Sequence, residues 1–435
     1  MSFCEQPGLL PINVAIDAQL AHVNTVTEQE QIALNNALGR ILACDIQSEI
    51  AVPLADNSAM DGYAFQLEDH GANLQVDLHK QPFKLIGKAL AGHPFTGKVS
   101  SGECVRIMTG AVLPKGTNTV VMQEQAVQLS SEDIKAASPV LDASEECEWV
   151  SFQSEVQLGQ NVRQQGEDIA KGATVLKKGT RLTAAHLALI ASIGIGQVTV
   201  FRRVKVGVLA TGDELKLAGE ALAQGELYEC NRVGLIAMLQ RLGVAVKDYG
   251  ILPDDYDSIK AAFVQADEEC DWIISSGGVS VGEADFVRNV ISEVGNVDFW
   301  KVAIKPGKPY AFGKLPSSVL SGLPGNPVSS FVTFLQLVVP ALRHMAGESQ
   351  APKNMYFSAT SDGNIRKHPA RADYQRGTYY TNAQGELRVT PVPKQGSNIM
   401  TSFSQANCFI VLEQGRGNVQ QDERVSVLPF DELLR

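Results

Sequence analysis

The sequence contains few cysteines and histidines, and neither residue type is spaced as in a cross-link or a zinc site. Its 435 residues include 7 cysteines and 7 histidines, scattered along the chain without a Cys-x-x-Cys or His-x-x-x-His pair. Disulfide frameworks and zinc sites depend on such spacings. An odd number of isolated cysteines is typical of a reducing compartment, and we therefore expect a cytoplasmic protein without disulfides or zinc.

Positive charge and long hydrophobic runs are also scarce. The 37 lysines and arginines are outnumbered by 48 aspartates and glutamates, which gives a net charge of −11. A broad nucleic-acid-binding face needs the opposite balance. The longest apolar stretches, residues 187–196 and 331–342, are short for a bilayer span, and the first residues lack the pattern of a secretory signal. We expect no nucleic-acid partner and no membrane segment, whereas the acidic balance suits sites for metal cations.

Between residues 204 and 347, short apolar runs alternate regularly with helix-like segments. The composition, 44% hydrophobic and 20% charged, is that of a globular protein, and the length fits about three domains. Strands that alternate with helices predict a mostly parallel sheet, whose ligands bind at the carboxyl ends of the strands. The predicted strands are residues 204–209, 244–251, 271–275, 297–304 and 319–320, and the predicted helices are residues 231–242, 257–268, 284–294 and 327–344.

The flanking regions have different patterns. Upstream, a helix at residues 183–194, N-capped by Thr183, precedes a strand at 197–201. Downstream, two hairpins are predicted, one from residues 377–381 and 386–391 and one from 407–412 and 423–428. We therefore predict a multi-domain α/β protein. Its expected parts are a mixed α+β linker or dimerisation domain (residues 1–50 and 166–203), an inserted β-rich domain (51–165), a mostly parallel α/β sandwich domain (204–347) and a small C-terminal β-barrel-like domain (352–435).

Two glycine-rich loops at the ligand end of the predicted sheet could bind an anion. In residues 275–282, small residues follow a buried strand, so that backbone N–H groups can converge on a phosphate, although a simple turn has the same pattern. Residues 322–330 have the form of a capped helix start, yet their glycines favour an anion cradle. The candidate anion-binding residues are Ser276, Gly277, Gly278 and Ser280 in the first loop, and Pro324, Gly325, Asn326 (as N-cap) and Pro327 in the second, with free N–H groups expected just beyond.

Lysines lie between these two loops. Lys301 and Lys305 are two alternations apart, so both side chains are expected on one face of a strand. Such pairs are usually solvated surface lysines. Three lysines within residues 301–308 of an acidic protein, at the predicted ligand end, favour an anion pocket.

Carboxylates follow successive elements of the same sheet. Glu214 comes after the first strand, Asp254 after the second, and Asp285 directly behind the first glycine-rich loop. Each alone could be a helix cap. Three oxygen ligands on separate loops at one sheet edge suit Mg²⁺ and not zinc. The polar segments 56–64, 106–111 and 166–169 specify no chemistry by themselves.

Taken together, these segments resemble the molybdopterin molybdenumtransferases, bacterial enzymes related to the C-terminal domain of gephyrin. The matching segments run in order through nearly the whole chain: residues 56–64, 106–111, 166–169, 211–215, 275–286, 303–313, 322–329, 371–373 and 395–397. The resemblance implies an enzyme that takes adenylylated molybdopterin and molybdate, inserts molybdenum at the dithiolene and releases AMP in a Mg²⁺-dependent hydrolysis. It also implies a homodimer with a composite active site, and transient contacts with the molybdopterin adenylyltransferase and with cofactor-accepting apoenzymes.

The resemblance also assigns roles to individual residues. Glu214, Asp254 and Asp285 would contact Mg²⁺ and pyrophosphate. Lys301 and Lys305 would neutralise molybdate or substrate phosphate, and residues 322–327 would receive an anionic group. The catalytic set would be completed from the other subunit by Asp61, Thr109 and Asp168.

One departure and two alternatives accompany the resemblance. Cys230 stands where relatives more often have a hydroxyl residue, although Asn231 could still cap the following helix. A molybdopterin adenylyltransferase is one alternative, but it needs only a chain the size of residues 204–347. A non-catalytic dimeric scaffold that binds molybdopterin is the other, and it need not keep the carboxylates and lysines.

Overall fold

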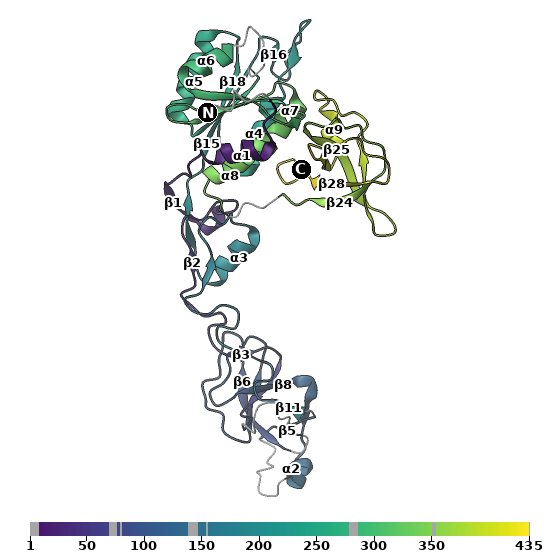
Figure 1. Ribbon diagram of the computed structural model, residues 1–435. Coiled ribbons are helices and arrows are strands. Elements are labelled where there is room, and N and C mark those ends of the chain that lie inside the picture. The colour runs from purple at the N-terminus through teal and green to yellow at the C-terminus, as the bar shows by residue number, and fades with distance from the viewer. Residues whose placement is uncertain are drawn as a thin grey trace. The chain divides into compact units, whose positions relative to one another are not determined.

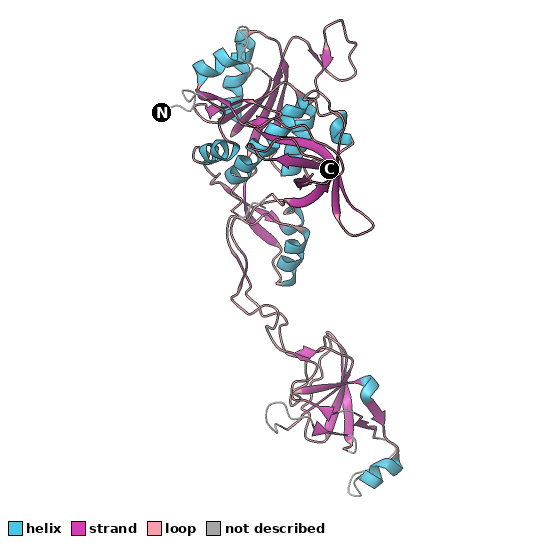
Figure 2. Cartoon of the chain, turned by 45° about the vertical axis from the view of Figure 1, so that its right-hand side comes forward, coloured by secondary structure: helices cyan, strands magenta, loops and turns pink. Residues whose placement is uncertain are grey.

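The computed structural model describes residues 8–68, 76–78, 81–137, 147–153, 155–277, 286–349 and 354–434. The chain forms two compact units, whose elements are labelled in Figure 1 and coloured by type in Figure 2. The larger unit comprises Met1–Cys44, Lys178–Leu187 and Gln197–Arg435, and the smaller comprises Asp45–Lys177 and Ala188–Gly196. Each has hydrophobic cores of its own, as expected for a multi-domain α/β protein.

A six-stranded sheet forms the centre of the larger unit, with the strand order β18-β15-β19-β23-β22-β20. The first four strands are parallel, and β22 is antiparallel to both β23 and β20. The predicted mostly parallel sheet is therefore confirmed. Its strands are β15 (Lys205–Thr211), β18 (Ala245–Leu252), β19 (Trp272–Ser276), β20 (Asn296–Lys301), β22 (Pro309–Lys314) and β23 (Val319–Leu323).

Helices cover both faces of this sheet because its strands are apolar on both sides. Ile273 packs in one core with α5 and α6, whereas its neighbour Ile274 packs in another core with α4, α7 and α8. Figure 1 shows these two helical layers around β15 and β18. The helices are α4 (Asn231–Leu242), α5 (Tyr256–Glu269), α6 (Phe286–Val294), α7 (Pro327–Thr333) and α8 (Val339–Met345), and a short excursion carries β16 (Leu215–Lys216) and β17 (Leu227–Tyr228).

The predicted strand at residues 297–304 is interrupted. β20 ends at Lys301, and the next strand, β21 (Ile304–Lys305), pairs with β25 in a different sheet. The residues between them bond elsewhere, because the Val302 N–H donates to the Lys308 carbonyl and the Ala303 N–H to the Leu10 carbonyl. The expectation that Lys301 and Lys305 share one face of one strand is therefore wrong.

The predicted helix at residues 327–344 is also interrupted. A π-helical stretch, Phe334–Val338, separates α7 from α8. Pro340 has no N–H to donate to the Gln336 carbonyl, which removes one α-helical hydrogen bond there. The combined segment Pro327–Met345 has the length and mean hydropathy of a membrane span, but 78% of it is buried inside the protein, as in a core helix.

The C-terminal strands close into a barrel. They follow the order β25-β26-β24-β28-β27, and β27 also pairs with β25. Both predicted hairpins are confirmed, since β25 is antiparallel to β26 and β27 to β28. The elements are β24 (Phe357–Ser361), β25 (Ala372–Thr381), β26 (Leu387–Pro391), α9 (Thr401–Ser404), β27 (Cys408–Leu412) and β28 (Arg424–Pro429).

The N-terminal part of the larger unit pairs distant segments. β1 (Gln29–Ala33) is antiparallel to β14 (Gln197–Phe201), which confirms the predicted strand there. The Thr183 hydroxyl accepts the His186 N–H at 3.4 Å, so the predicted N-cap of α3 (Ala184–Ser192) is also confirmed. Helix α1 (Ile12–Leu20) packs on the core that contains α8.

The smaller unit is built on a six-stranded sheet with the order β8-β4-β7-β6-β10-β9. Phe65, Phe83 and Phe152 lie in contact at its core. The elements of the smaller unit are β2 (Ile46–Gln47), β3 (Asn57–Ser58), β4 (Gly62–Phe65), β5 (Val76–Asp77), β6 (Phe83–Ala89), β7 (Glu103–Ile107), β8 (Thr119–Met122), β9 (Ala126–Gln128), α2 (Ser131–Ala137), β10 (Trp149–Phe152), β11 (Glu155–Val156), β12 (Val162–Arg163) and β13 (Thr174–Leu176).

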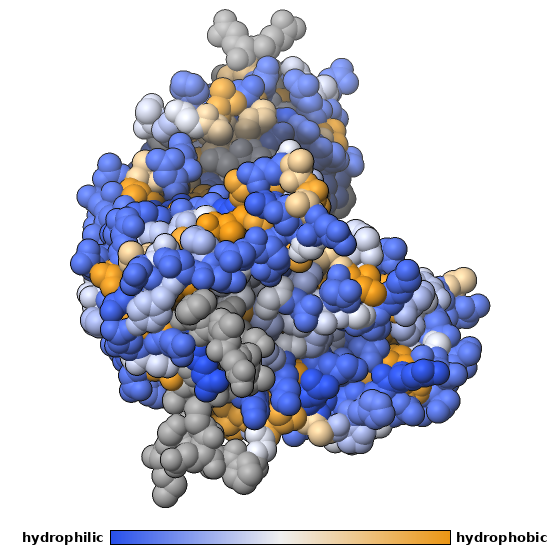
Figure 3. Space-filling model, turned by 90° about the horizontal axis from the view of Figure 1, so that it is seen from above, coloured by the Kyte–Doolittle hydropathy of each residue, from blue (hydrophilic) through white to orange (hydrophobic). Residues whose placement is uncertain are grey.

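The face of the molecule that Figure 3 shows from above is mainly hydrophilic, with hydrophobic side chains in small separate areas.

Candidate functional site

The carboxyl ends of the parallel strands are aligned at one edge of the sheet. Thr211 at the end of β15 pairs with Leu252 at the end of β18, and Ser276 at the end of β19 pairs with Leu323 at the end of β23. The loops that follow these strands therefore emerge side by side, where open α/β sheets bind ligands. The expectation that these predicted site loops share one edge is confirmed for the described residues.

The loops after β15 and β18 are joined by their carboxylates. The Asp254 N–H donates to Asp213 Oδ1 at 3.0 Å, and the Asp213 N–H donates to Asp254 Oδ2 at 3.4 Å. A Cβ on Gly212 would lie 2.5 Å from Glu214 Oε2, so the Glu214 carboxylate is folded against this backbone. Sequence reasoning missed Asp213, although it stands beside Glu214 in the same turn.

Asp254 is not the cap of α5. That position belongs to Asp255, whose Oδ2 accepts the Ser258 N–H at 2.9 Å. The Ser258 hydroxyl and, to a smaller extent, the Ser258 N–H hold the pKa of Asp255 below its usual value. The helix-cap interpretation of Asp254 is therefore wrong, and its exposed carboxylate remains available to a ligand.

The described residues at this edge supply two carboxylates for a hard cation such as Mg²⁺, but not a complete set of protein ligands. Glu214 and Asp254 offer carboxylate oxygens on adjacent loops, which Mg²⁺ binds together with substrate phosphates. In the described part of the chain, no group of three His, Cys, Asp or Glu side chains could hold a metal ion by itself. Asp285, Gly278 and Ser280 lie outside the described residues.

The start of the first glycine-rich loop is tied to the sheet. Gly277 has a φ of +96°, a conformation that favours glycine, and its N–H donates to the Leu323 carbonyl at 3.1 Å. The Ser275 hydroxyl donates to the Gly277 carbonyl at 3.2 Å. The Gly277 N–H is thus used by the fold and is not free for an anion.

The second loop begins a helix, but not as expected. Asn326 occupies the N-cap position and Pro327 the first helical position, yet the Asn326 side chain makes no capping hydrogen bond. The Val328 N–H, expected to be free, donates to the Ser397 carbonyl at 3.0 Å. The C-terminal barrel supplies this acceptor, which no pattern near Val328 could have indicated.

The two predicted lysines have different surroundings. The antiparallel pairing of β20 with β22, and of β22 with β23, makes β20 run in the direction of β23, so Lys301 is exposed at the carboxyl edge of the sheet. The Lys305 ammonium is 2.9 Å from the buried Asp373 carboxylate of the barrel. Lys305 is therefore partly neutralised, whereas Lys301 presents its charge to solvent.

A side chain that sequence reasoning had assigned to helix capping connects the two glycine-rich loops. The N-cap position of α4 is held by Cys230, and Asn231 is the first helical residue. The buried Asn231 amide donates to the Ser276 hydroxyl at 2.9 Å and to the Gly325 carbonyl at 2.8 Å. Only its place at the end of the loop after β17 could have drawn attention to it.

In the smaller unit the three polar segments converge. Asp61 Oδ1 accepts the Thr109 N–H at 2.7 Å and the Thr109 hydroxyl at 2.8 Å, and these two bonds hold the pKa of Asp61 below its usual value. The Gln165 N–H donates to Asp56 Oδ1 at 2.7 Å, which draws in the segment before Asp168. The structure therefore brings Asp61 and Thr109 into direct contact and leaves Asp168 exposed on the neighbouring turn.

Comparisons with known proteins agree with one another. The family models described as "MoeA N-terminal region (domain I and II)", "Probable molybdopterin binding domain" and "MoeA C-terminal region (domain IV)" match residues 10–194, 207–344 and 358–430. The chain is 45% identical to a molybdopterin molybdenumtransferase of Haemophilus influenzae, with 98% of this chain and 100% of that protein covered. It is 31% identical to one of Bacillus subtilis, with 96% and 94% covered. The crystal structure of a molybdopterin biosynthesis protein, moeA, from Pyrococcus horikoshii OT3 matches with a TM-score of 0.79 at 28% identity, over 97% of this chain and 100% of that one.

Proposed function

Because this chain belongs to the molybdopterin molybdenumtransferase family, we propose that it transfers molybdenum from molybdate to adenylylated molybdopterin and releases AMP with the help of Mg²⁺. The chain is accordingly a transferase of molybdenum cofactor biosynthesis. The proposed reaction would be the last step of that biosynthesis. The observation that carries the proposal is the aligned carboxyl edge of the sheet. There the Glu214 and Asp254 carboxylates emerge beside the loops that begin at Ser276 and Pro324.

The lysines and the exposed backbone at this edge would bind the anionic groups of the substrates. The exposed Lys301 ammonium would attract molybdate or a substrate phosphate at the end of β20. Lys305 would contribute less charge, because the Asp373 carboxylate lies 2.9 Å from its ammonium. The backbone at Gly325 and Asn326, exposed at the start of α7, would accommodate an anionic group.

The acidic residues would hold the cation. Glu214 and Asp254 would hold Mg²⁺ for the phosphoanhydride. Asp285, which is proposed from the sequence alone, would be a third ligand. When bound, Mg²⁺ supplies Lewis-acid polarisation of the phosphoanhydride and offsets charge on the leaving AMP. The Asp213–Asp254 hydrogen bonds would keep these two loops at a fixed separation while the substrate binds.

The smaller unit would complete the site in a homodimer. Asp61, Thr109 and Asp168 would come from the partner subunit, so that each site is composed of two chains. The bonds from Thr109 lower the pKa of the Asp61 carboxyl and so favour its ionised form. Its charge would orient a hydrogen-bond donor of the substrate. Transient contact with the adenylyltransferase that supplies the substrate, and with apoenzymes that accept the cofactor, would take place in the cytoplasm.

The experiment that tests this function is AMP release from adenylylated molybdopterin with Mg²⁺, measured with and without molybdate. We expect release that depends on molybdate, with molybdenum retained on the pterin. Formation of adenylylated molybdopterin from ATP would instead identify an adenylyltransferase. Tight molybdopterin binding without AMP release under any of these conditions would identify a scaffold.

A further inference from the structure

The Asn231 side chain does not act as a helix cap. A capping asparagine accepts a backbone N–H of the first turn through its Oδ1. Here the N–H of Arg232 donates to Glu229 Oε1 instead, at 2.6 Å. Both donors of the Asn231 amide point away from the helix, one to the Ser276 hydroxyl and one to the Gly325 carbonyl. Only 7% of the residue is exposed, so these bonds are made out of water.

These two acceptors belong to the two loops of the proposed anion site. Ser276 is the last residue of β19, directly before the first glycine-rich loop. Gly325 lies between β23 and α7, and a Cβ placed on it would meet nothing within 4 Å. Gly325 is also exposed to solvent. Its carbonyl accepts the Asn231 amide at 2.8 Å, a contact that ties this loop to α4.

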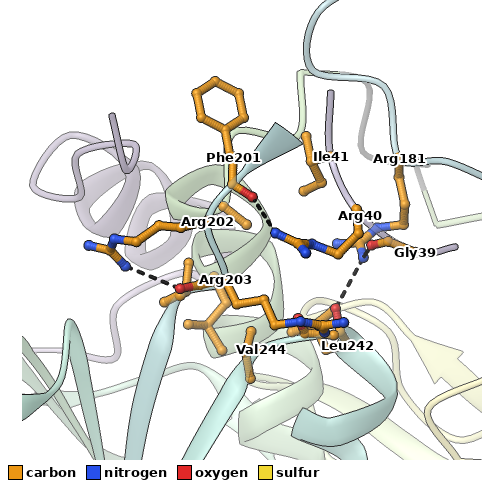
Figure 4. A pocket seen from close by; sticks show the side chains of 13 residues that line it. Gly39, Arg40, Ile41, Arg181, Phe201, Arg202, Arg203, Leu242 and Val244 are labelled. Atoms are coloured by element: carbon orange, nitrogen blue, oxygen red, sulfur yellow. Dashed lines mark hydrogen bonds between the residues drawn. The ribbon is translucent and has the colours of Figure 1, made fainter. Parts of the chain in front are cut away.

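Helix α4 gives Asn231 a rigid base. A Cβ on Gly234 would lie 2.2 Å from the Phe331 ring, so α4 and α7 are packed closely at this point. Residues three apart in a helix share one face, which directs Asn231 towards the loop before α7. At the other end of α4, Arg181 donates to the Leu242 carbonyl at 3.0 Å (Figure 4). Arg203 donates to the Gly243 carbonyl there at 2.6 Å.

We propose that Asn231 is a positioning residue that fixes Ser276, at the end of β19, relative to Gly325, before α7, and thereby sets the affinity of the site for the nucleotide and oxyanion groups of its substrates. This inference rests on the proposed function for the identity of those substrates. It assigns to Asn231 no contact with a substrate. An amide is suited to this role because its two donors can reach two acceptors at once.

Cys230 orients this amide. Its thiol donates to Asn231 Oδ1 at 3.8 Å, which leaves the amide nitrogen facing the loops. Cys230 is exposed as a residue, but partial desolvation of its thiol and, to a smaller extent, Glu229 raise the pKa of that thiol, so it keeps a proton to donate. A serine keeps a hydroxyl donor at this position. We therefore expect Cys230→Ser to retain wild-type kinetics and Cys230→Ala to show a small part of the defect of an Asn231 variant.

The test compares Asn231→Asp with a matched variant in the barrel. Asp has the shape of Asn but places a carboxylate oxygen against the Gly325 carbonyl, where a donor stood. Asn407 also donates its amide to a backbone carbonyl, that of Tyr379 at 3.0 Å, while its Oδ1 accepts the Tyr379 N–H at 2.8 Å. Asn407→Asp therefore removes one amide-to-carbonyl bond of the same kind away from the site.

We expect Asn231→Asp to raise the KM for molybdate and for adenylylated molybdopterin about tenfold, which corresponds to about 1.4 kcal/mol of binding free energy. The fall in kcat should be smaller than the rise in KM. AMP binding, measured by calorimetry, should weaken by a similar factor. Amide hydrogen exchange at Gly325 and Asn326, which lie between two prolines, should accelerate. Asn407→Asp should lower thermal stability without these changes.

Two results would overturn the proposal: Asn231→Asp kinetics and AMP binding equal to those of Asn407→Asp, or unchanged hydrogen exchange at Gly325 and Asn326. If Asn231→Asp does not fold, Asn231→Ser, whose shorter side chain cannot reach both acceptors, is subject to the same comparison. Failure of the proposed function looks different, because then the wild-type protein itself would release no AMP. The exchange measurement would still decide the role of Asn231 in that case.

Discussion

The two edges of the central sheet use acidic residues in opposite ways. At the amino edge, Asp271 receives two hydrogen bonds from Arg202, at 2.7 and 2.9 Å, and one from the Lys205 N–H. Burial acts to raise the pKa of Asp271, but these bonds outweigh it and lower the pKa below its usual value. At the carboxyl edge, Glu214 and Asp254 are exposed and, within the described residues, are not paired with a cation.

The difference separates structural from functional carboxylates. An acid that already has its full set of donors cannot bind a ligand without breaking the fold. An acid that shares only weak backbone bonds at a strand end can accept a cation at little cost. The comparison therefore indicates a stabilising role for the acids at the amino edge, and it supports the proposed cation-binding role of those at the carboxyl edge.

The largest effect is expected from Glu214→Ala at the carboxyl edge. Because the side chain is exposed, thermal stability should be unchanged, whereas molybdenum insertion should fall by about 100-fold or more as a cation ligand is lost. The measurement is AMP release with molybdate, beside a thermal melt. Glu220→Ala, an exposed glutamate in the same excursion, is the matched control and should keep its turnover. Near-normal turnover of Glu214→Ala would remove this residue from the site.

The converse is expected for Asp267→Ala, near the amino edge. Asp267 Oδ1 accepts the Ser318 N–H at 2.8 Å and the Ser318 hydroxyl at 2.7 Å, and the Ser317 N–H also donates to this carboxylate. Its removal leaves the two buried Ser318 donors without an acceptor, which should cost about 3 kcal/mol of unfolding free energy. Urea unfolding measures the loss. A fall in AMP release as large as that expected for Glu214→Ala would contradict the comparison between the two edges.

A mixed dimer extends the comparison to the smaller unit. Asp61→Ala and Asp285→Ala subunits should each be inactive alone. If each site takes Asp61 from one chain and Asp285 from the other, a mixed dimer keeps one unmutated site, and an equal mixture should recover about a quarter of wild-type activity. The measurement is AMP release after the two variants are unfolded and refolded together. Continued inactivity, with mixed dimers shown to form, would mean that the site is not shared.

The sequence predicted the sheet, its helices and the barrel hairpins because these depend on local periodicity. It could not predict where Val328 and Lys305 find their partners, since Ser397 and Asp373 come from the barrel, about 70 residues further along the chain. It placed Lys301 and Lys305 on one strand because the pattern continues through Val302. Only the bond from the Ala303 N–H to Leu10, nearly three hundred residues earlier, shows why that strand ends.

The same limit explains the assignment of Asn231. Its position before an amphipathic segment is typical of a cap, and the local pattern holds no sign of Gly325, 94 residues away. Motifs predicted the edge of the sheet at which we propose the site. The hydrogen bonds that hold its loops together come from contacts distant in sequence, which a motif does not contain.

The smallest effect is expected from Thr109→Val, which tests how the Asp61 charge is maintained. The pKa of Asp61 is depressed by the Thr109 N–H first and by the Thr109 hydroxyl second. A depressed carboxyl pKa stabilises the folded state above the unfolded-state pKa, and this contribution is lost as pH falls through the folded-state pKa. Valine removes the hydroxyl and keeps the N–H, so the midpoint of Asp61 should move upward only part of the way to its ordinary value. Titration of the carboxyl carbon by NMR, with Asp61→Asn to assign the signal, measures the shift. An unchanged midpoint would mean that the backbone N–H alone keeps Asp61 ionised, and the hydroxyl of Thr109 would then be left free for the substrate.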